Sequence, residues 1–280
     1  MAPDILFSTI ERYHEQKPWG RMLDAGTGVN SVKWMLGLDC EDWLGITADR
    51  RMKDNVVKEA KLEADESDRI VVGNWMEESF CSTLGMFDTI VADYLFGAVD
   101  GFSPHTQDLV MKKLKQHLKP GGSLYIIGMY PIPDHASGPA DIIAEIRRVR
   151  DSCILLAGHR PYRELPSEWV IRHLIKEGFE VRKTRNFNIL HSKDSAIRQI
   201  RVARSKLDLM ENGAVRGGMQ LYLDDLEARV EEIMEESDTK SLTLSHDYVI
   251  AADLPGANAS SSADDGGNAA MATVFDSVIN

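Results

Sequence analysis

The segment Met22–Ser31 places an apolar strand end, an acidic residue and two spaced glycines directly before the start of a helix. Glycines are favoured at such a turn because the chain bends sharply and its backbone can lie close to a ligand that a Cβ would obstruct. The acid, Asp24, precedes Gly26, Thr27 and Gly28. A carboxylate there repels a pyrophosphate at the helix N-terminus but attracts a cation. The segment therefore predicts an α/β fold with a site for a positively charged nucleoside ligand.

Further strand patterns follow the glycine turn in order along the chain. They cover residues 43–49, 70–75, 87–94 and 118–128. Because they alternate with helical patterns, they predict a parallel sheet with right-handed crossovers, and ligands bind beyond the carboxyl ends of such strands. Polar residues stand at or just after these ends, namely Asp24, Thr47, Asp49, Asn74 and Asp93.

This series resembles the class I S-adenosylmethionine-dependent methyltransferases over residues 5 to 253. The segments FDTIVAD at 87–93 and LKPGG at 118–122 carry the resemblance more specifically than the glycine turn does. The resemblance implies a Rossmann-like sheet of about seven strands, the last antiparallel, with helices on both faces. It also implies S-adenosylmethionine as the cofactor and an in-line methyl transfer, which the protein promotes mainly by aligning the reacting atoms.

The resemblance assigns parts of the cofactor to particular residues. The backbone amides of Gly26 and Gly28 would face the methionyl carboxylate, and Asp24 and Asp93 would lie near its ammonium group. The whole predicted cofactor-binding set is Asp24, Gly26, Thr27, Gly28, Thr47, Asp49, Asn74, Trp75, Asp93 and Tyr94.

The nucleoside end of this predicted site departs from the family pattern. Asn30 stands where a third glycine is common, and Thr47 stands where the second strand usually ends in an acid. Thr47, or Asp49 two residues later, is expected to hold the ribose. Asn74 and Trp75 are expected beside the adenine, where the amide oxygen of Asn74 can accept the bond that an aspartate would accept.

The domain organisation follows from helical periodicity and composition. Ile5, Leu6, Ile10 and Tyr13 predict an N-terminal cap helix within residues 1–19, lying across the cofactor cleft. The methyltransferase domain is expected over 20–253. It includes a helical insertion at 194–238, between strands six and seven, which is interpreted as a lid or as a solvated helical pair. Residues 254–280 are expected to be a disordered tail.

The acceptor chemistry is less constrained. A general base is needed for a hydroxyl, a thiol or a protonated amine, but not for a thioether or a neutral amine. Tyr94, His105 and His159 are the candidates for proton transfer. His105 is expected in the first turn of a helix that begins at Ser103 and Pro104.

Two arginines, a histidine and a tyrosine are concentrated in residues 158–166. With Tyr130, the side chains of Arg160, Tyr162 and Arg163 form the predicted substrate-binding set. Guanidinium groups clamp carboxylates, so a small acidic metabolite would fit. The alternative is that Arg163 pairs with Glu164 or caps a helix. The sequence does not decide between oxygen, nitrogen and sulfur as the acceptor, and a thioether acid is one hypothesis.

Bulk properties exclude several classes. The net charge of −12 disfavours nucleic acid as a substrate. Cys40, Cys81 and Cys153 lack the spacing of a metal site or a disulfide framework. No signal-like or membrane-length apolar stretch is present, so a cytoplasmic protein is expected. The oligomeric state cannot be read from the sequence.

Two other functions stay open. An NAD-dependent Rossmann oxidoreductase shares a glycine turn followed by a strand-end acid, but Asp24, Ser31 and Asp93 disfavour it. A non-catalytic methyltransferase-like scaffold could bind partners through the acidic helix near residues 224–236 and the tail.

Overall fold

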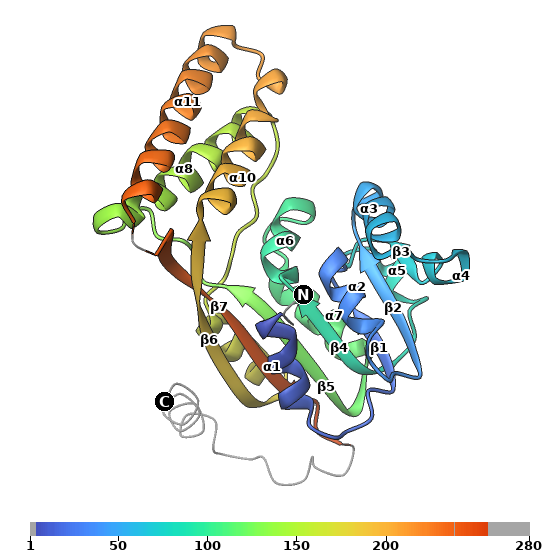
Figure 1. The fold of residues 1–280 in the computed structure, drawn as a ribbon. Helices are drawn as coiled ribbons and strands as arrows, with labels where there is room; N and C mark the ends of the chain where they lie inside the picture. Colours follow the sequence, from blue (N-terminus) through green and yellow to red (C-terminus); the bar gives the residue numbers. More distant parts are fainter. Residues whose placement is uncertain (1–3, 238, 257–280) are drawn as a thin grey trace. The chain divides into compact units, whose positions relative to one another are not determined.

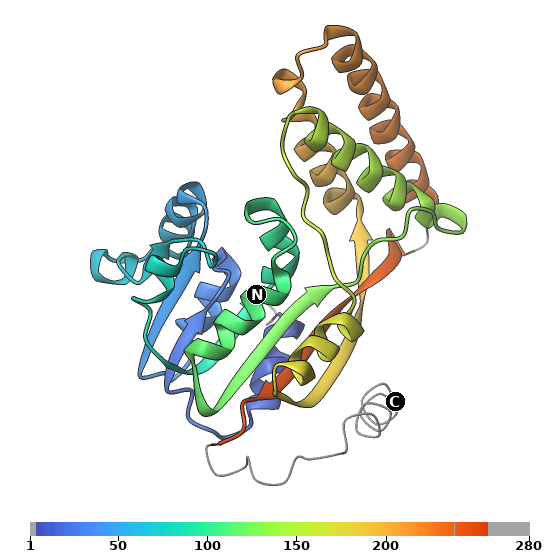
Figure 2. The same ribbon diagram turned by 180° about the vertical axis from the view of Figure 1, so that it is seen from behind.

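The computed structural model describes residues 4–237 and 239–256 and divides the chain into two compact units. Unit 1 contains the chain up to Met129, residues 164–186 and the chain from Tyr248 onward. Unit 2 contains Tyr130–Arg163 and Phe187–Asp247. Figures 1 and 2 show the chain from opposite sides. Most of the predicted disordered tail, 254–280, lies outside the described residues.

A seven-stranded sheet has the order β3-β2-β1-β4-β5-β7-β6. Its strands are β1 Arg21–Asp24, β2 Asp42–Thr47, β3 Ile70–Val72, β4 Phe87–Asp93, β5 Leu118–Met129, β6 Glu180–Ser192 and β7 Ser241–Asp253. The strands from β3 to β5 are parallel neighbours. The amide of Gly121 donates to the carbonyl of Leu254, and the amide of Leu254 donates to the carbonyl of Gly122. These bonds join the start of β5 to the end of β7, so β7 is antiparallel. The predicted fold class is confirmed.

Helices cover both faces of the sheet in unit 1. They are α1 Ile5–His14, α2 Val29–Met35, α3 Arg50–Ala60, α4 Ala64–Ser67, α5 Glu78–Cys81, α6 Leu95–Phe102, α7 Gln107–His117 and α9 Ser167–Lys176. The helices α1 and α2 lie on one face, and α7 and α9 lie on the other (Figures 1 and 2). None of the helices in the described part of the chain is long and apolar enough to cross a membrane.

The N-terminal helix α1 packs on the face of the sheet. Phe7 stacks on Trp34 of α2 with ring centroids 4.8 Å apart, and His14 stacks on Trp19 at 3.6 Å. The Nδ1 atom of His14 lies 2.9 Å from the hydroxyl of Tyr125, in the middle of β5. Aromatic stacking therefore fixes α1 on the face of the sheet, with its His14 end against β5. That α1 lies across the cofactor cleft stays a prediction.

His14 belongs to a buried polar network between α1 and the strands β5, β6 and β7. Arg182 donates to the Tyr125 hydroxyl at 3.3 Å, which leaves the hydroxyl proton for Nδ1 of His14. Arg182 also forms an ion pair with Asp253 at 2.7 Å. The Nε2 atom of His14 is buried and has no hydrogen-bond partner among the described residues. Burial lowers the pKa of His14, and the nearby charges of Lys17 and Arg182 lower it further.

This network predicts a pH dependence of stability. Because the pKa of His14 is lowered in the folded state, the unfolded chain binds a proton more readily, so His14 destabilises the fold as the pH falls below about 6.5. We expect the unfolding free energy of the wild type minus that of His14→Phe, measured by urea titration, to fall as the pH falls from 7.5 to 5.5. Phenylalanine keeps the stack on Trp19 without titrating. A constant difference would contradict the assignment.

Unit 2 contains three long helices, α8 Asp141–Leu156, α10 Lys193–Arg204 and α11 Gly213–Glu236, with short 3₁₀ turns η1 Gly138–Ala140 and η2 Leu207–Leu209. They pack side by side in both views (Figures 1 and 2). Their shared core includes Ile142, Ile146, Val149, Ile197, Ile200, Ala203, Leu223, Leu226 and Val230.

The helical unit is larger than the predicted insertion at 194–238. The pairing of α10 with α11 was expected, but α8 joins them because its apolar side chains are buried against the same core. Unit 2 therefore includes 130–163 as well as the expected insertion. The role of this segment as a lid stays a prediction.

Candidate functional site

The turn after β1 is tied to two neighbouring strands and to Trp75 in the loop after β3. The amide of Ala25 donates to the carbonyl of Val91 in β4 at 2.8 Å, and that of Thr27 donates to Ile46 in β2 at 2.7 Å. The hydroxyl of Thr27 donates to the carbonyl of Asp24 at 3.1 Å, and the buried indole of Trp75 donates to that of Ala25 at 2.8 Å. The turn is thus held rigidly over the carboxyl ends of the strands.

The two glycines of this turn are glycines for different reasons. A Cβ on Gly26 would lie 3.1 Å from the Cβ of Leu95, so close packing against α6 requires its absence. Gly28 has an extended backbone (φ −128°, ψ 175°) that any residue adopts, and the nearest atom to an added Cβ is the hydroxyl oxygen of Ser31, at 3.9 Å. Neither strain nor packing explains Gly28. The bare backbone there fits a ligand lying against the turn.

Asp24, the last residue of β1, is enclosed. Its relative exposure is 0%, and neither carboxylate oxygen has a hydrogen-bond partner among the described residues. Burial raises the pKa of Asp24 to about 6, and the nearby donors of Ser31, Gly26 and Thr27 offset this rise only in part. The sequence suggested a carboxylate lining an open site. The structure instead places a buried, only partly compensated carboxylate at the start of the glycine turn, where a bound cation would favour its charged form.

The polar residues after β2 and β3 are engaged within the fold. Asp49 caps α3 by accepting from the amide of Arg51 at 2.9 Å. Thr47 is buried at the end of β2, and its hydroxyl accepts from the amide of Asp49 at 3.3 Å. Asn74 accepts from the amide of Met76 at 2.9 Å. Its amide nitrogen also donates to Ser103 at 2.9 Å.

Asp93 ends β4, and Tyr94 follows it as the N-cap of α6; both are half-buried. Tyr94 has a left-handed backbone (φ 49°, ψ 20°), and its amide donates to Ile127 in β5 at 2.9 Å. A bulky residue in this conformation is strained by about 1–3 kcal/mol, and such strain is concentrated at functional sites. This junction adjoins the glycine turn, because Leu95 packs on Gly26.

The predicted helix start at Ser103 is wrong. Ser103 is the C-cap of α6, an unpredicted helix, and α7 begins at Gln107. His105 therefore lies in the intervening turn with a left-handed backbone (φ 64°), where its amide donates to Asp100 at 3.2 Å. Its side chain is 82% exposed. This exposure weakens the case for His105 as a proton-transfer residue.

The remaining candidates belong to unit 2. His159 is exposed, and its Nδ1 atom accepts from Lys206 at 3.2 Å. The amide of Tyr130 donates to the carbonyl of His246 at 2.8 Å. Arg160 and Tyr162 are exposed on the segment that follows α8.

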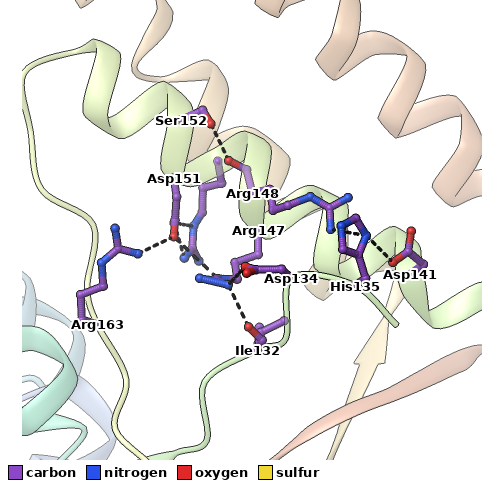
Figure 3. Close-up of polar contacts among 10 residues, drawn as sticks. Ile132, Asp134, His135, Asp141, Arg147, Arg148, Asp151, Ser152 and Arg163 are labelled. Carbon is purple, nitrogen blue, oxygen red and sulfur yellow. Dashed lines mark hydrogen bonds and ion pairs between the residues drawn. The ribbon is translucent and has the colours of Figure 1, made fainter. Parts of the chain in front are cut away.

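Arg163 is engaged within unit 2 by the buried carboxylate of Asp151. Arg150 donates to Asp151 at 2.8 Å. Arg163 donates to it at 3.4 Å, and Arg147 forms an ion pair with it at 3.7 Å (Figure 3). Arg163 is thus engaged by Asp151, a partner that neither the substrate-binding prediction nor its alternative, pairing with Glu164 or capping a helix, had named. A substrate carboxylate would have to compete with Asp151 for this guanidinium.

The Asp151 cluster predicts that replacing Asp151 destabilises the fold much more than replacing Asp134 does. Because the Asp151 side chain is 10% exposed and balances three guanidinium groups, we expect Asp151→Ala to lower the free energy of unfolding by about 2 kcal/mol. Asp134 is 79% exposed and pairs with Arg147 alone at 3.3 Å, so Asp134→Ala should change stability little. Urea unfolding of the two variants measures the difference. Equal effects would show that the cluster is not stabilising.

Within unit 1 the fold brings Asp24, Thr47, Asn74 and Asp93 to the same edge of the sheet, since each stands at or just after the end of a parallel neighbour. Sequence reasoning missed Leu95, Ser31 and Ser103. Leu95 explains Gly26, the Ser31 hydroxyl bonds both the amide and the carbonyl of Gly28, and Ser103 holds Asn74. The capping position of Ser31, three residues after Gly28, was the one available signal.

This sheet order, with the glycine turn at the end of β1, defines the fold of the class I S-adenosylmethionine-dependent methyltransferases. A protein of Bacillus halodurans C-125, described as a candidate methyltransferase, shares it with a TM-score of 0.55, 14% identity, and coverage of 89% of this chain and 98% of its own. The YcgJ protein of Bacillus subtilis shares it with a TM-score of 0.54, 16% identity, and coverage of 89% and 97%. Neither a protein-family model nor a curated protein sequence matches the chain.

Proposed function

We propose that this protein is an S-adenosylmethionine-dependent methyltransferase. The observation that carries the proposal is the buried, only partly compensated carboxylate of Asp24 in the same turn as the bare Gly28 backbone. A chain that only needed stability would not keep an acid there, because burial raises its pKa and disfavours its charged form.

The residues present fit this donor. When bound, S-adenosylmethionine supplies a sulfonium-activated methyl group, and its ammonium and sulfonium charges suit a carboxylate-bearing edge. Asp24 and Asp93 would provide the negative field, and the Gly28 backbone would leave room for the methionyl end. Exclusion of water by the surrounding apolar strand ends would strengthen these interactions. An NAD pyrophosphate would be repelled by Asp24, so the oxidoreductase alternative is disfavoured.

The acceptor we propose is a small, carboxylate-bearing metabolite, with a thioether sulfur as one candidate nucleophile. The arginine-rich segment 158–166 supports this class. Arg160, Arg163, Tyr130 and Tyr162 are the proposed contacts of that carboxylate, which would compete with Asp151 for the guanidinium of Arg163. For an acceptor that carries a proton, Tyr94 at the strained β4–α6 junction is favoured over the exposed His105 and His159 as the group that takes it.

Two measurements test the proposal. S-adenosylhomocysteine should raise the melting temperature of the purified chain in proportion to its concentration, and NADH should not. The chain should then release S-adenosylhomocysteine from S-adenosylmethionine with at least one compound of a panel of carboxylated thioethers, phenols and amines. Stabilisation by NADH alone would support the oxidoreductase. Binding without turnover on the whole panel would support the scaffold, and silence from the thioethers alone would end the sulfur hypothesis.

A further inference from the structure

We propose that Glu164 is a positioning residue: its carboxylate stabilises the first turn of α6 and thereby holds Tyr94 in place at the β4–α6 junction. The inference rests on the proposed function and deepens it, because Tyr94 belongs to the proposed cofactor site and is the favoured group for proton transfer. All of the contacts that carry it lie within unit 1. Glu164 acts through Tyr94 and is assigned no contact with the methyl donor or the acceptor.

The start of α6 lacks charge compensation from its own residues. Its N-cap, Tyr94, has a left-handed backbone and makes no side-chain cap hydrogen bond, and the first turn contains no acidic residue. Helices usually begin with a small polar cap or an acid, because their first backbone amides have no intrahelical partner and carry partial positive charge. The start of α6 therefore depends on groups from elsewhere in the chain.

The carboxylate of Glu164 supplies this compensation from the segment that precedes α9. A Cβ on Gly97, in the first turn of α6, would lie 2.5 Å from the carboxylate carbon of Glu164, which is closer than two unbonded carbons approach. The carboxylate thus occupies the place of a side chain at position 97. Because the Cα–Cβ bonds of a helix tilt toward its N-terminus, a group in that place lies over the helix start. Glu164 is half-buried, which strengthens its attraction to the positive end of the helix.

The segment that precedes α9 is anchored to the strand β5. The buried hydroxyl of Tyr248, in β7, donates to the carbonyl of Leu165 at 3.0 Å. The same hydroxyl lies against Gly128 in β5, where a Cβ would collide with it. Gly128 follows Ile127, whose carbonyl accepts from the amide of Tyr94 at 2.9 Å. The contacts therefore form a closed path that runs from Tyr94 through β5 and β7 to this segment and back to α6.

This path holds Tyr94 from two sides. Its amide is bonded to β5, and the helical turn that follows it is stabilised by Glu164. A left-handed conformation is costly for a bulky residue and persists only where the surrounding contacts over-determine it. Removing the charge of Glu164 weakens one of the two sides, so Tyr94 should shift or exchange between conformations while the sheet stays folded.

Fluorine NMR of the ligand-free full chain, labelled with 3-fluorotyrosine, tests this inference. The Tyr94 resonance is the one that disappears in Tyr94→Phe. We expect Glu164→Gln to shift or broaden that resonance, whereas a variant that is merely less stable keeps it. The matched control Glu180→Gln, which replaces an exposed acid at the start of β6, should leave it unchanged. An unchanged Tyr94 resonance in Glu164→Gln would overturn the inference.

Gly97→Ala is an independent variant, because its methyl group displaces the carboxylate of Glu164 without removing it. Alanine favours a helix more than glycine does, so the fold should tolerate this change. Each variant should lower kcat about 10-fold or more with any compound of the panel that is methylated, and should change the dissociation constant of S-adenosylhomocysteine less than about 3-fold.

The double variant Glu164→Gln with Gly97→Ala should lose no more activity than either single variant, since both changes remove the same contact. Additive losses, or an unchanged kcat in Glu164→Gln, would overturn the inference. Failure of S-adenosylhomocysteine to bind the wild type would instead overturn the proposed function, whatever the Tyr94 resonance shows.

Discussion

Replacing Asp24 with asparagine should stabilise the ligand-free protein and abolish binding of S-adenosylhomocysteine. The pKa of Asp24 rises from an ordinary value near 3.8 to about 6 on folding. A rise of this size corresponds to an energetic penalty of about 3 kcal/mol at neutral pH. Asparagine keeps the shape without the charge, so we expect a gain of about 2 kcal/mol in the free energy of unfolding, measured by urea titration, once its own buried amide is allowed for.

The pH dependence of stability provides a second comparison of the wild type with Asp24→Asn. Because the folded pKa lies above the unfolded one, the folded state binds more protons between them, and the contribution of Asp24 to stability falls as the pH rises from about 4 to about 6. The advantage of Asp24→Asn over the wild type should grow across that window and level off above it. Asp65→Asn, an exposed acid in α4, is the matched control. A destabilised Asp24→Asn with intact ligand binding would make Asp24 a structural acid only.

Adding one methyl group at Gly28 should separate folding from binding. The backbone at Gly28 accepts an alanine, and its Cβ would enter open space beside Ser31. We therefore expect Gly28→Ala to melt within about 2 °C of the wild type and to bind S-adenosylhomocysteine at least about 10-fold more weakly, because the methyl occupies ligand space. Calorimetry and a melting curve on one preparation measure both quantities.

Two other glycine variants serve as controls for Gly28→Ala. Gly26→Ala should lower the melting temperature, since its Cβ would lie 3.1 Å from the Cβ of Leu95. Gly218→Ala lies in the exposed part of α11 with no atom near its Cβ, so it should preserve or raise stability and leave ligand binding unchanged. Unchanged binding by Gly28→Ala would show that the turn does not hold the ligand.

The first five strands were predictable because each contains a short apolar run between turn signals, and β1 to β5 lie where the sequence placed them. The failures have local causes. The helix α6 contains Gly97 and Gly101 and carries no helical signature. Ser103 and Pro104 imitate a helix start, but the carboxylate of Asp100 holds the His105 amide in a turn instead. Whether α8 packs on the sheet or on α10 depends on contacts between residues that are distant in sequence.

The candidate site was also predictable only in part. The residues at the strand ends could be named from spacing, because parallel strands end at one edge. Spacing cannot show which hydrogen-bond or ion-pair partner each side chain has in the fold. That Asn74 is held by Ser103, that Asp49 caps α3 and that Asp151 engages Arg163 are all contacts formed by the fold. The enclosure of Asp24 was also unforeseen, since a strand-end acid looks the same in sequence whether it is open or buried.

The helical unit has its own apolar core, drawn from two separate stretches of the chain. None of the residues named for that core belongs to the glycine turn after β1, so we expect the effects of substitutions in the core to add to those of changes at the turn. A lineage could then remodel α8, α10 and α11 without altering the turn, which makes this module a natural place for descendants of the protein to diversify.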